Sequence, residues 1–350
     1  MARRWLVGIL GSTLVLLGAG ALVVTTAPTI DVQGHRGARG LLPENSLSAF
    51  AAARKLGVST LELDTNVTAD DVLVITHDPR LNPSIARDAS GRWVSDPTPS
   101  VRSLSFDQLS SYDVGRLQPG TEYAARFPTQ RPVDGTRIPS LAALFDQVQA
   151  SGDTSVRFNI ETKLEPDAPE LSPSPAQFAD LLITEIRSHH LEERTTIQSF
   201  DWRTLAEVQR RAPEIPTVAL TEADRATLDG PWTNGLRLAE FGGSVPRLVH
   251  ASGASIWSPD VSTLTTNEVD VAHRLGLKVI PWTVNEPAEI RRVIDMGVDG
   301  AISDYPGRAI DVVNTMQKPL LNPLFAGVGI AAGLVVLLAG ITGRPRRMFE

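Results

Sequence analysis

Apolar and polar residues alternate strictly over residues 61–64, where two leucines are interleaved with Glu62 and Asp64. A period of two is typical of a strand and turns both carboxylates to the same face. The next apolar run, residues 72–75, follows a connection that is too short for a helical crossover, which favours an antiparallel return. The pattern therefore predicts a tight hairpin in which His77, just after the return strand, lies opposite the two carboxylates.

A second alternation runs over residues 156–163 and places Asn159, Glu161 and Lys163 on one face of a predicted strand. Polar side chains that point into a protein interior are costly unless a ligand, a metal or an ion pair satisfies them. Two interpretations follow from the pattern alone, which are a buried Glu161–Lys163 ion pair and a binding site.

The remaining hydrophobic pattern predicts strands that alternate with helices. Strands are expected near residues 30–32, 61–64, 72–75, 156–162, 196–198, 217–220, 255–257, 278–282 and 301–303, and helices over residues 43–56, 141–148, 178–188, 203–211, 266–275 and 288–296. Repeated strand-then-helix order predicts a parallel sheet with helices outside it. The number of strands favours an α/β chain folded as a closed (β/α)₈ TIM-like barrel, irregular near the second and third strands.

Prolines interrupt residues 79–140 at short intervals, so no long helix or strand is expected there. Helical patterning appears only briefly, near residues 104–109. A loop-rich insertion of this size beside an active site commonly acts as a lid or a specificity segment. A solvated excursion without a role fits the same pattern.

Uncharged apolar runs occupy residues 5–24 and 324–343, and each is long enough to cross a bilayer. Arginines lie at the outer end of each run, so the positive-inside rule places both termini in the cytoplasm. The runs predict a two-pass plasma-membrane protein, with transmembrane helices within residues 1–27 and 319–350, the lipid bilayer as a partner, and an extracytoplasmic catalytic domain over residues 28–318. A cleaved signal peptide is the competing interpretation of the first run.

Composition narrows the function classes. The 350 residues include 33 basic and 40 acidic ones, a formal net charge of −7, and show no basic stripe, which argues against a nucleic-acid partner. The chain contains no cysteine, which excludes disulfides and thiolate chemistry. Carboxylates with an imidazole nearby instead suit a divalent metal, and hard oxygen ligands favour Ca²⁺ or Mg²⁺ over a soft-ligand metal.

Four short motifs follow one another in the first quarter of the chain, namely His35-Arg36-Gly37, Pro43-Glu44-Asn45, Glu62-x-Asp64 and His77-Asp78. In order and spacing they resemble the glycerophosphodiester phosphodiesterase family, although Ser46 replaces the more usual threonine after the second motif. The resemblance covers roughly residues 30–315 and continues through Asn159-Ile160-Glu161-Thr162-Lys163, Gln198-Ser199-Phe200, Pro281-Trp282-Thr283-Val284-Asn285 and Gly297-Val298-Asp299-Gly300.

The resemblance implies a metal-dependent phosphodiester hydrolase that releases glycerol 3-phosphate and an alcohol from a small glycerophosphodiester. It implies that Glu62, Asp64 and Glu161 hold the metal, Ca²⁺ or Mg²⁺. Arg36 and Lys163 are then expected to supply the positive charge that a phosphodiester anion needs.

By the same resemblance, His35 and His77 act as general base and general acid, since imidazole titrates near neutrality. Glu44 and Asn45 are expected beside the site, and Trp282 is expected against the glycerol or the leaving group. Simpler interpretations also fit, because Asn45 can cap the predicted helix and Trp282 can fill the core.

Two other functions stay open on the sequence. One is a phospholipase D-like enzyme on the same barrel that acts on lysophospholipids, and the other is an inactive scaffold. Open as well are which histidine is the acid and whether water or the substrate's own glycerol hydroxyl attacks the phosphorus.

Overall fold

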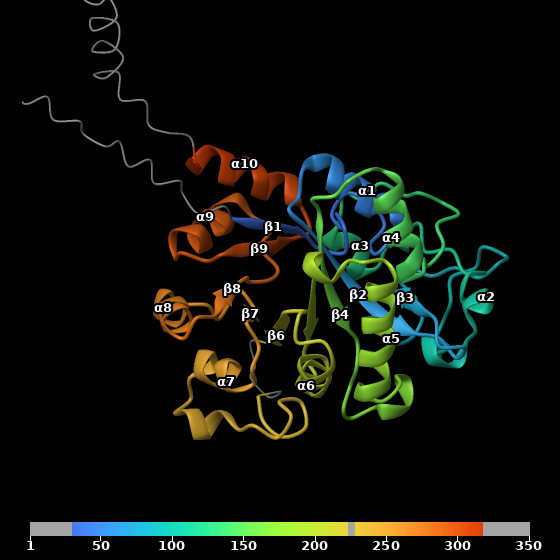
Figure 1. The fold of residues 1–350 in the computed structure, drawn as a ribbon. Coiled ribbons are helices and arrows are strands. Elements are labelled where there is room, and N and C mark those ends of the chain that lie inside the picture. Colours follow the sequence, from blue (N-terminus) through green and yellow to red (C-terminus); the bar gives the residue numbers. More distant parts are fainter. Residues whose placement is uncertain (1–29, 223–227, 318–350) are drawn as a thin grey trace, which may run out of the picture.

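The computed structural model describes residues 30–222 and 228–317, which form one sheet of nine strands with helices around it (Figure 1). The strands are β1 (Asp31–Gly34), β2 (Thr60–Val67), β3 (Leu73–Ile75), β4 (Arg157–Thr162), β5 (Thr195–Ser199), β6 (Thr217–Thr221), β7 (Ile256–Pro259), β8 (Lys278–Val279) and β9 (Gly300–Ser303). The α-helices are α1 (Leu47–Leu56), α2 (Phe106–Leu109), α3 (Glu122–Arg126), α4 (Leu141–Ala150), α5 (Pro175–Ser188), α6 (Trp202–Arg211), α7 (Val245–Ala251), α8 (Thr266–Arg274), α9 (Pro287–Asp295) and α10 (Pro306–Gln317). Short 3₁₀ turns are η1 (Val101–Ser103), η2 (Pro169–Leu171), η3 (Glu192–Arg194) and η4 (Leu238–Phe241).

Eight strands run parallel in the order β8-β7-β6-β5-β4-β2-β1-β9. The two ends of this path meet, because Asp299 N–H donates to the Val279 carbonyl (2.9 Å) and Ile302 N–H donates to the Pro281 carbonyl (3.0 Å). The sheet is therefore a nearly closed barrel, and the helices lie outside it (Figure 1). This confirms the predicted (β/α)₈ architecture.

The predicted hairpin is formed by β2 and β3, which pair antiparallel with Thr65 opposite Ile75. Thr76 N–H donates to the Asp64 carbonyl (3.0 Å), so His77 follows at the level of the β2 carboxylates. Among the named strands of the described residues, β3 pairs with β2 alone and antiparallel, so it stands outside the parallel set, and the barrel is irregular at this point as expected.

The barrel interior has a polar side, formed by β1, β2, β4 and β5. Asn159 Nδ2 donates to Gln33 Oε1 (2.9 Å) and to Gln198 Oε1 (2.8 Å). Gln198 Nε2 in turn donates to Glu62 Oε1 (2.7 Å). All four side chains are buried, and this network satisfies polar groups that the interior would otherwise leave without partners.

The other side of the interior, formed by β6 to β9, is apolar. It is filled by one small cluster, made of Val218, Ile256, Ile280 and Ile302 with Trp282 packed against it. The alternate residues of the strands face outward into the main core, where the helices cover them. The period of two along each strand thus separates the main core from the barrel interior.

Between β3 and α4 lies the insertion expected at about residues 79–140, which projects from one side of the barrel (Figure 1). Its buried residues Leu81, Ala86, Val101, Leu109 and Ile138 form a separate apolar cluster together with Val74 of β3. A segment that packs around its own buried residues is ordered structure rather than a solvated excursion.

The predicted localisation needs correction. Within residues 30–222 and 228–317, no helix is long and apolar enough to cross a membrane, so a two-pass membrane protein is not supported. The two apolar runs at residues 5–24 and 324–343, on which that prediction rested, lie outside the described residues.

The contact between sheet and helices predicts the effect of a core truncation. Phe145 of α4 is fully buried and packs edge-on against Phe158 of β4, with ring centroids 5.0 Å apart. Phe145→Ala is expected to lower the free energy of unfolding by about 3–5 kcal/mol, because it removes an aromatic ring and leaves a cavity. Urea unfolding measures this. Leu56→Ala, at a helix end where the side chain is 40% exposed, is the control and should cost less than about 1 kcal/mol. Equal losses in the two variants would contradict this account of the core.

Candidate active site

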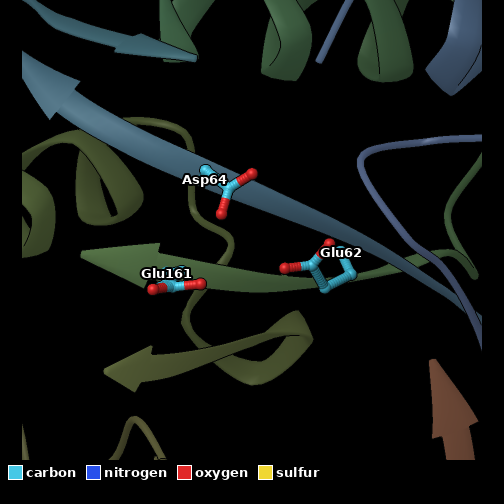
Figure 2. A group of neighbouring side chains, drawn as sticks. All are labelled: Glu62, Asp64 and Glu161. Atoms are coloured by element: carbon cyan, nitrogen blue, oxygen red, sulfur yellow. The ribbon is translucent and has the colours of Figure 1, made fainter. Parts of the chain in front are cut away.

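Three carboxylates from two neighbouring strands gather inside the barrel (Figure 2). Glu62 and Asp64 lie on β2 and Glu161 lies on β4, and the parallel register places Asp64 beside Glu161. One ligand oxygen from each residue lies within 4.8 Å of the others, and all three side chains are buried. The pairing of two strands thus assembles the three acidic residues predicted from the sequence, and their oxygens can hold a metal ion.

Burial and mutual repulsion change the protonation of these carboxylates. Burial and the charge of Asp64 raise the pKa of Glu62 well above its usual range. Burial also raises the pKa of Glu161 to about 7, with Lys163 opposing the rise and Asp64 adding to it. Asp64 differs, because Arg36 above all outweighs the effect of burial and holds the Asp64 pKa well below its usual range. Carboxylates that compete for ionisation in one buried volume, with oxygens as the only donors, fit a hard divalent cation.

Arg36 and Lys163 are the cationic side chains beside this cluster. Lys163 Nζ lies 2.8 Å from Glu161 Oε1 and 3.6 Å from Asp64 Oδ1. Arg36 Nε lies 3.1 Å from Asp64 Oδ2, and the Arg36 backbone N–H donates to Glu62 Oε2 (2.9 Å). The Glu161–Lys163 ion pair anticipated as one interpretation is therefore present, and it is part of the site rather than an alternative to it.

Both predicted histidines have an aspartate at Nδ1. His35 Nδ1 lies 2.7 Å from Asp304 Oδ1, and His77 Nδ1 lies 2.6 Å from Asp78 Oδ1. An ionised carboxylate only accepts hydrogen bonds, so each Nδ1 carries the proton and each Nε2 keeps its lone pair. His35 Nε2 faces Glu62, at 3.9 Å from Oε2.

The pKa of each imidazole is lowered. Burial and then Arg39 lower the pKa of His35 to about 4, against the opposing effect of Asp304. Burial, Lys163 and Arg36 lower the pKa of His77. Both side chains are therefore neutral at pH 7 in the protein alone, which is the form that accepts a proton.

The start of α1 differs from the prediction. The helix begins at Leu47 rather than at residue 43, and Ser46 caps it by accepting a hydrogen bond from Ala49 N–H (3.1 Å). Asn45 is not the cap. It has a positive φ of 54° and donates from Nδ2 to Asp64 Oδ2 (2.9 Å). The interpretation of Asn45 as a simple cap is wrong, because its amide is turned inward to the carboxylate cluster.

Glu44 joins the site to the insertion. Its Oε1 accepts from Arg36 Nη1 (2.7 Å), and its Oε2 accepts from the hydroxyl of Tyr123 on α3. Nearby, the Arg39 guanidinium lies over the ring of Phe127, 4.7 Å from its centroid. The insertion therefore reaches the arginines of the site through specific contacts.

A cavity of about 370 Å³ opens over these groups. Among its lining residues are the predicted His35, Arg36, Glu62, His77, Glu161, Lys163 and Trp282. Asp64, Glu44 and Asn45 are not among them, but each contacts Arg36: Asp64 and Glu44 through ion pairs, and Asn45 through its backbone N–H, which donates to the Arg36 carbonyl. Trp282 is partly exposed there, and its Nε1 donates to the Ser258 carbonyl (3.0 Å).

Asp304 is the main residue of the site that the sequence analysis missed. Besides His35, it accepts from Arg39 Nε (2.8 Å to Oδ1) and Arg39 Nη2 (3.1 Å to Oδ2), and from Asn285 Nδ2 (2.8 Å to Oδ2). Its position directly after the predicted strand at residues 301–303 was an available signal, because polar groups at strand ends of a barrel commonly serve the site. Its partner His35 lies 269 positions earlier in the chain, which no local pattern connects.

The chain is similar to glycerophosphodiester phosphodiesterases along most of its length. The model of the glycerophosphoryl diester phosphodiesterase family matches residues 35–308. A glycerophosphodiester phosphodiesterase from Caldanaerobacter subterraneus subsp. tengcongensis is 29% identical over 282 residues, which cover 81% of this chain and 97% of that protein. One from Bacillus subtilis is 27% identical over 282 residues, covering 78% of this chain and 82% of that protein.

Among solved structures, this fold is similar to that of a Silicibacter pomeroyi DSS-3 protein assigned as a glycerophosphoryl diester phosphodiesterase. The TM-score is 0.76 at 35% sequence identity, and the match covers 83% of this chain and 95% of that one.

The Asp304 network predicts a pH-dependent contribution to stability. Although burial opposes ionisation, His35 and then Arg39 hold the pKa of Asp304 below its usual range. A depressed folded-state pKa contributes stability that is present above the unfolded-state value, about 3.9, and is lost as the pH falls through the folded-state pKa. Asp304→Asn is therefore expected to cost about 3 kcal/mol at pH 7, since it leaves Arg39 without its buried partner.

Urea unfolding at several pH values measures this cost. The difference in free energy of unfolding between Asp304→Asn and the unaltered chain should narrow below pH about 4, where the carboxyl group of the unfolded chain becomes protonated. Asp107→Asn, at an exposed position in the first turn of α2, serves as the control and should show no such difference. A difference in free energy of unfolding that grows as the pH falls would contradict the lowered pKa of Asp304.

Proposed function

The chain belongs to the glycerophosphoryl diester phosphodiesterase family and is an enzyme of that class, and we propose that it cleaves glycerophosphodiesters to glycerol 3-phosphate and an alcohol by metal-assisted catalysis with two histidines. The observation that carries the proposal is the strand register that unites Glu62, Asp64 and Glu161 in one buried cluster. Cationic and imidazole side chains line the same cavity. This combination suits a phosphodiester, which needs charge neutralisation and two proton transfers.

The three carboxylates would hold Ca²⁺ or Mg²⁺, since both prefer oxygen ligands. Such an ion supplies Lewis-acid polarisation of a phosphoryl oxygen. Arg36 and Lys163 add fixed positive charge beside it. Their partners are the carboxylates of the cluster, so the guanidinium and ammonium groups lie beside the position proposed for the metal, where they would meet the phosphoryl oxygens of a substrate.

Two proton transfers are assigned to His35 and His77. One imidazole accepts, at Nε2, the proton of the attacking hydroxyl group, which belongs to water or to the glycerol moiety of the substrate. The other imidazole first takes up a proton at Nε2 and then, as the imidazolium, donates that proton to the alcohol oxygen as the bond from this oxygen to phosphorus breaks. Asp304 and Asp78 keep the tautomers suitable for these roles by accepting from each Nδ1.

Metal removal tests the proposal. We expect the full-length protein to release glycerol 3-phosphate from glycerophosphocholine, to lose at least about 100-fold of this activity with a chelator, and to regain it with Ca²⁺ or Mg²⁺. Full activity in the chelator would contradict the metal assignment. Product from lysophosphatidylcholine alone would favour the lysophospholipid function instead, and no product from either would remove the proposed activity.

Two variants separate metal binding from proton transfer in the same assay. Glu161→Gln is expected to weaken binding of Ca²⁺ or Mg²⁺, measured by calorimetry, because it removes one of three anionic ligands. His77→Asn should leave that binding within about twofold and lower turnover by at least about 100-fold. Normal turnover by His77→Asn would overturn its catalytic role.

The contact of Tyr123 with Glu44 makes the insertion a positioning element for Arg36. Tyr123→Phe removes the donor to Glu44, so Glu44 holds the guanidinium less well. A hydrogen bond to a charged group contributes about 1.5–3 kcal/mol, so we expect kcat/KM for glycerophosphocholine to fall by at least about tenfold. Tyr112→Phe, the same change at a residue packed on the cluster of the insertion, is the matched control. Similar kinetics for the two variants would contradict the positioning role.

A further inference from the structure

The cavity has a second side, which the proposed chemistry does not use. The ionic groups come from β1, β2 and β4, and the strand order continues from β4 around the barrel through β5, β6, β7 and β8. The residues that line the cavity on this second side are mostly apolar or aromatic. We define the aromatic side as Phe200, Leu220, Trp232 and Trp282, which follow or belong to β5, β6 and β8.

Two rings of the aromatic side form a rigid corner. Phe200 and Trp282 lie with their centroids 5.5 Å apart and their planes at 84°. The indole of Trp282 is held in place, because its Nε1 donates to the Ser258 carbonyl and its ring packs on the apolar cluster of the barrel interior. Phe200, Trp232 and Trp282 all keep partial exposure toward the cavity. Preformed, partly exposed ring faces at right angles offer a ligand two π surfaces at once.

Charge is distributed unevenly around the cavity. Among the described lining residues, the cationic side chains are Arg36, Arg39 and Lys163, and all three belong to the ionic side. Glu165, on the loop after β4, lines the cavity and is exposed, and its carboxylate has no hydrogen bond or ion pair within the described chain. Glu165 therefore adds an unpaired negative charge to the cavity wall, which favours a positively charged group in a ligand.

From these observations we propose that the aromatic side is the subsite for the alcohol moiety and selects alcohols that carry a quaternary or protonated ammonium group. A cation over the faces of tryptophan and phenylalanine is attracted by the ring quadrupoles, and the attraction grows as the group is desolvated. A trimethylammonium group also buries its methyl groups against the rings. The inference rests on the proposed function and specifies its substrate class.

A series of glycerol 3-phosphate esters tests the selection, with release of glycerol 3-phosphate from the full-length, metal-loaded protein as the readout. The esters carry choline, ethanolamine, glycerol or 3,3-dimethylbutanol, the last being the uncharged analogue of choline. We expect kcat/KM for the choline ester to exceed that for the dimethylbutyl and glycerol esters by about tenfold, within the range that a cation over ring faces gives. Equal values for the choline and dimethylbutyl esters would overturn recognition of charge.

Substitutions test which residues produce the preference for the choline ester. Phe200→Leu and Trp232→Leu keep apolar side chains but remove ring faces, and each should bring the ratio of choline to dimethylbutyl ester toward one. Glu165→Gln should reduce the same ratio by about two- to fivefold. Trp93→Leu, at an aromatic residue of the insertion that contacts Arg87, is the matched control and should leave the ratio unchanged.

The outcomes distinguish this inference from the function on which it rests. Suppose that Phe200→Leu and Trp232→Leu lower kcat/KM equally for all esters while their circular dichroism spectra stay native. The aromatic side would then bind the glycerol phosphate portion that all the esters share, and this result would overturn the inference alone. No glycerol 3-phosphate from any ester would overturn the proposed function and this inference together.

Discussion

Buried negative charge inside the barrel is the constraint on which the rest of the site depends. The register of β2 and β4 buries Glu62, Asp64 and Glu161 inside the barrel, below the cavity that Glu62 and Glu161 line. An isolated buried carboxylate is far too costly to persist, so the fold must provide cations and hydrogen-bond donors around the cluster. Arg36 and Lys163 meet part of this need, and amide donors from Asn45 and Gln198 meet more of it.

This compensation explains why the chain after β1 adopts an unusual backbone. Arg36 and Asn45 both have positive φ values, 50° and 54°, which non-glycine residues adopt only at a cost. Both conformations bring a donor to the carboxylates, from the Arg36 backbone N–H to Glu62 and from the Asn45 amide to Asp64. The helix α1 then begins only at Leu47, because the residues before it serve the cluster. The cost of these two backbone conformations is offset by the hydrogen bonds that they bring to the buried carboxylates.

Local features of the site could be predicted from the sequence, whereas contacts between distant segments could not. The alternation around Glu62 and around Glu161 indicated two strands and the side on which their carboxylates lie, because strand periodicity is a local property. The early part of α1 was predicted wrongly, since helical spacing says nothing of a charge cluster that pulls Asn45 inward. Contacts such as His35 with Asp304, or Glu44 with Tyr123, depend on closure of the barrel and packing of the insertion, which no short pattern contains.

The division of the barrel interior follows from the same constraint. The polar network of Gln33, Asn159 and Gln198 continues the hydrogen-bonding environment of Glu62 down one half of the barrel. The other half needs no such network, because β6 to β9 bring no carboxylate into the interior among the described residues, and aliphatic side chains fill it. The cavity lies over both halves, and its lining is ionic on one side and largely apolar or aromatic on the other. The two sides can therefore serve two parts of one molecule, an anionic centre and a substituent of different chemistry.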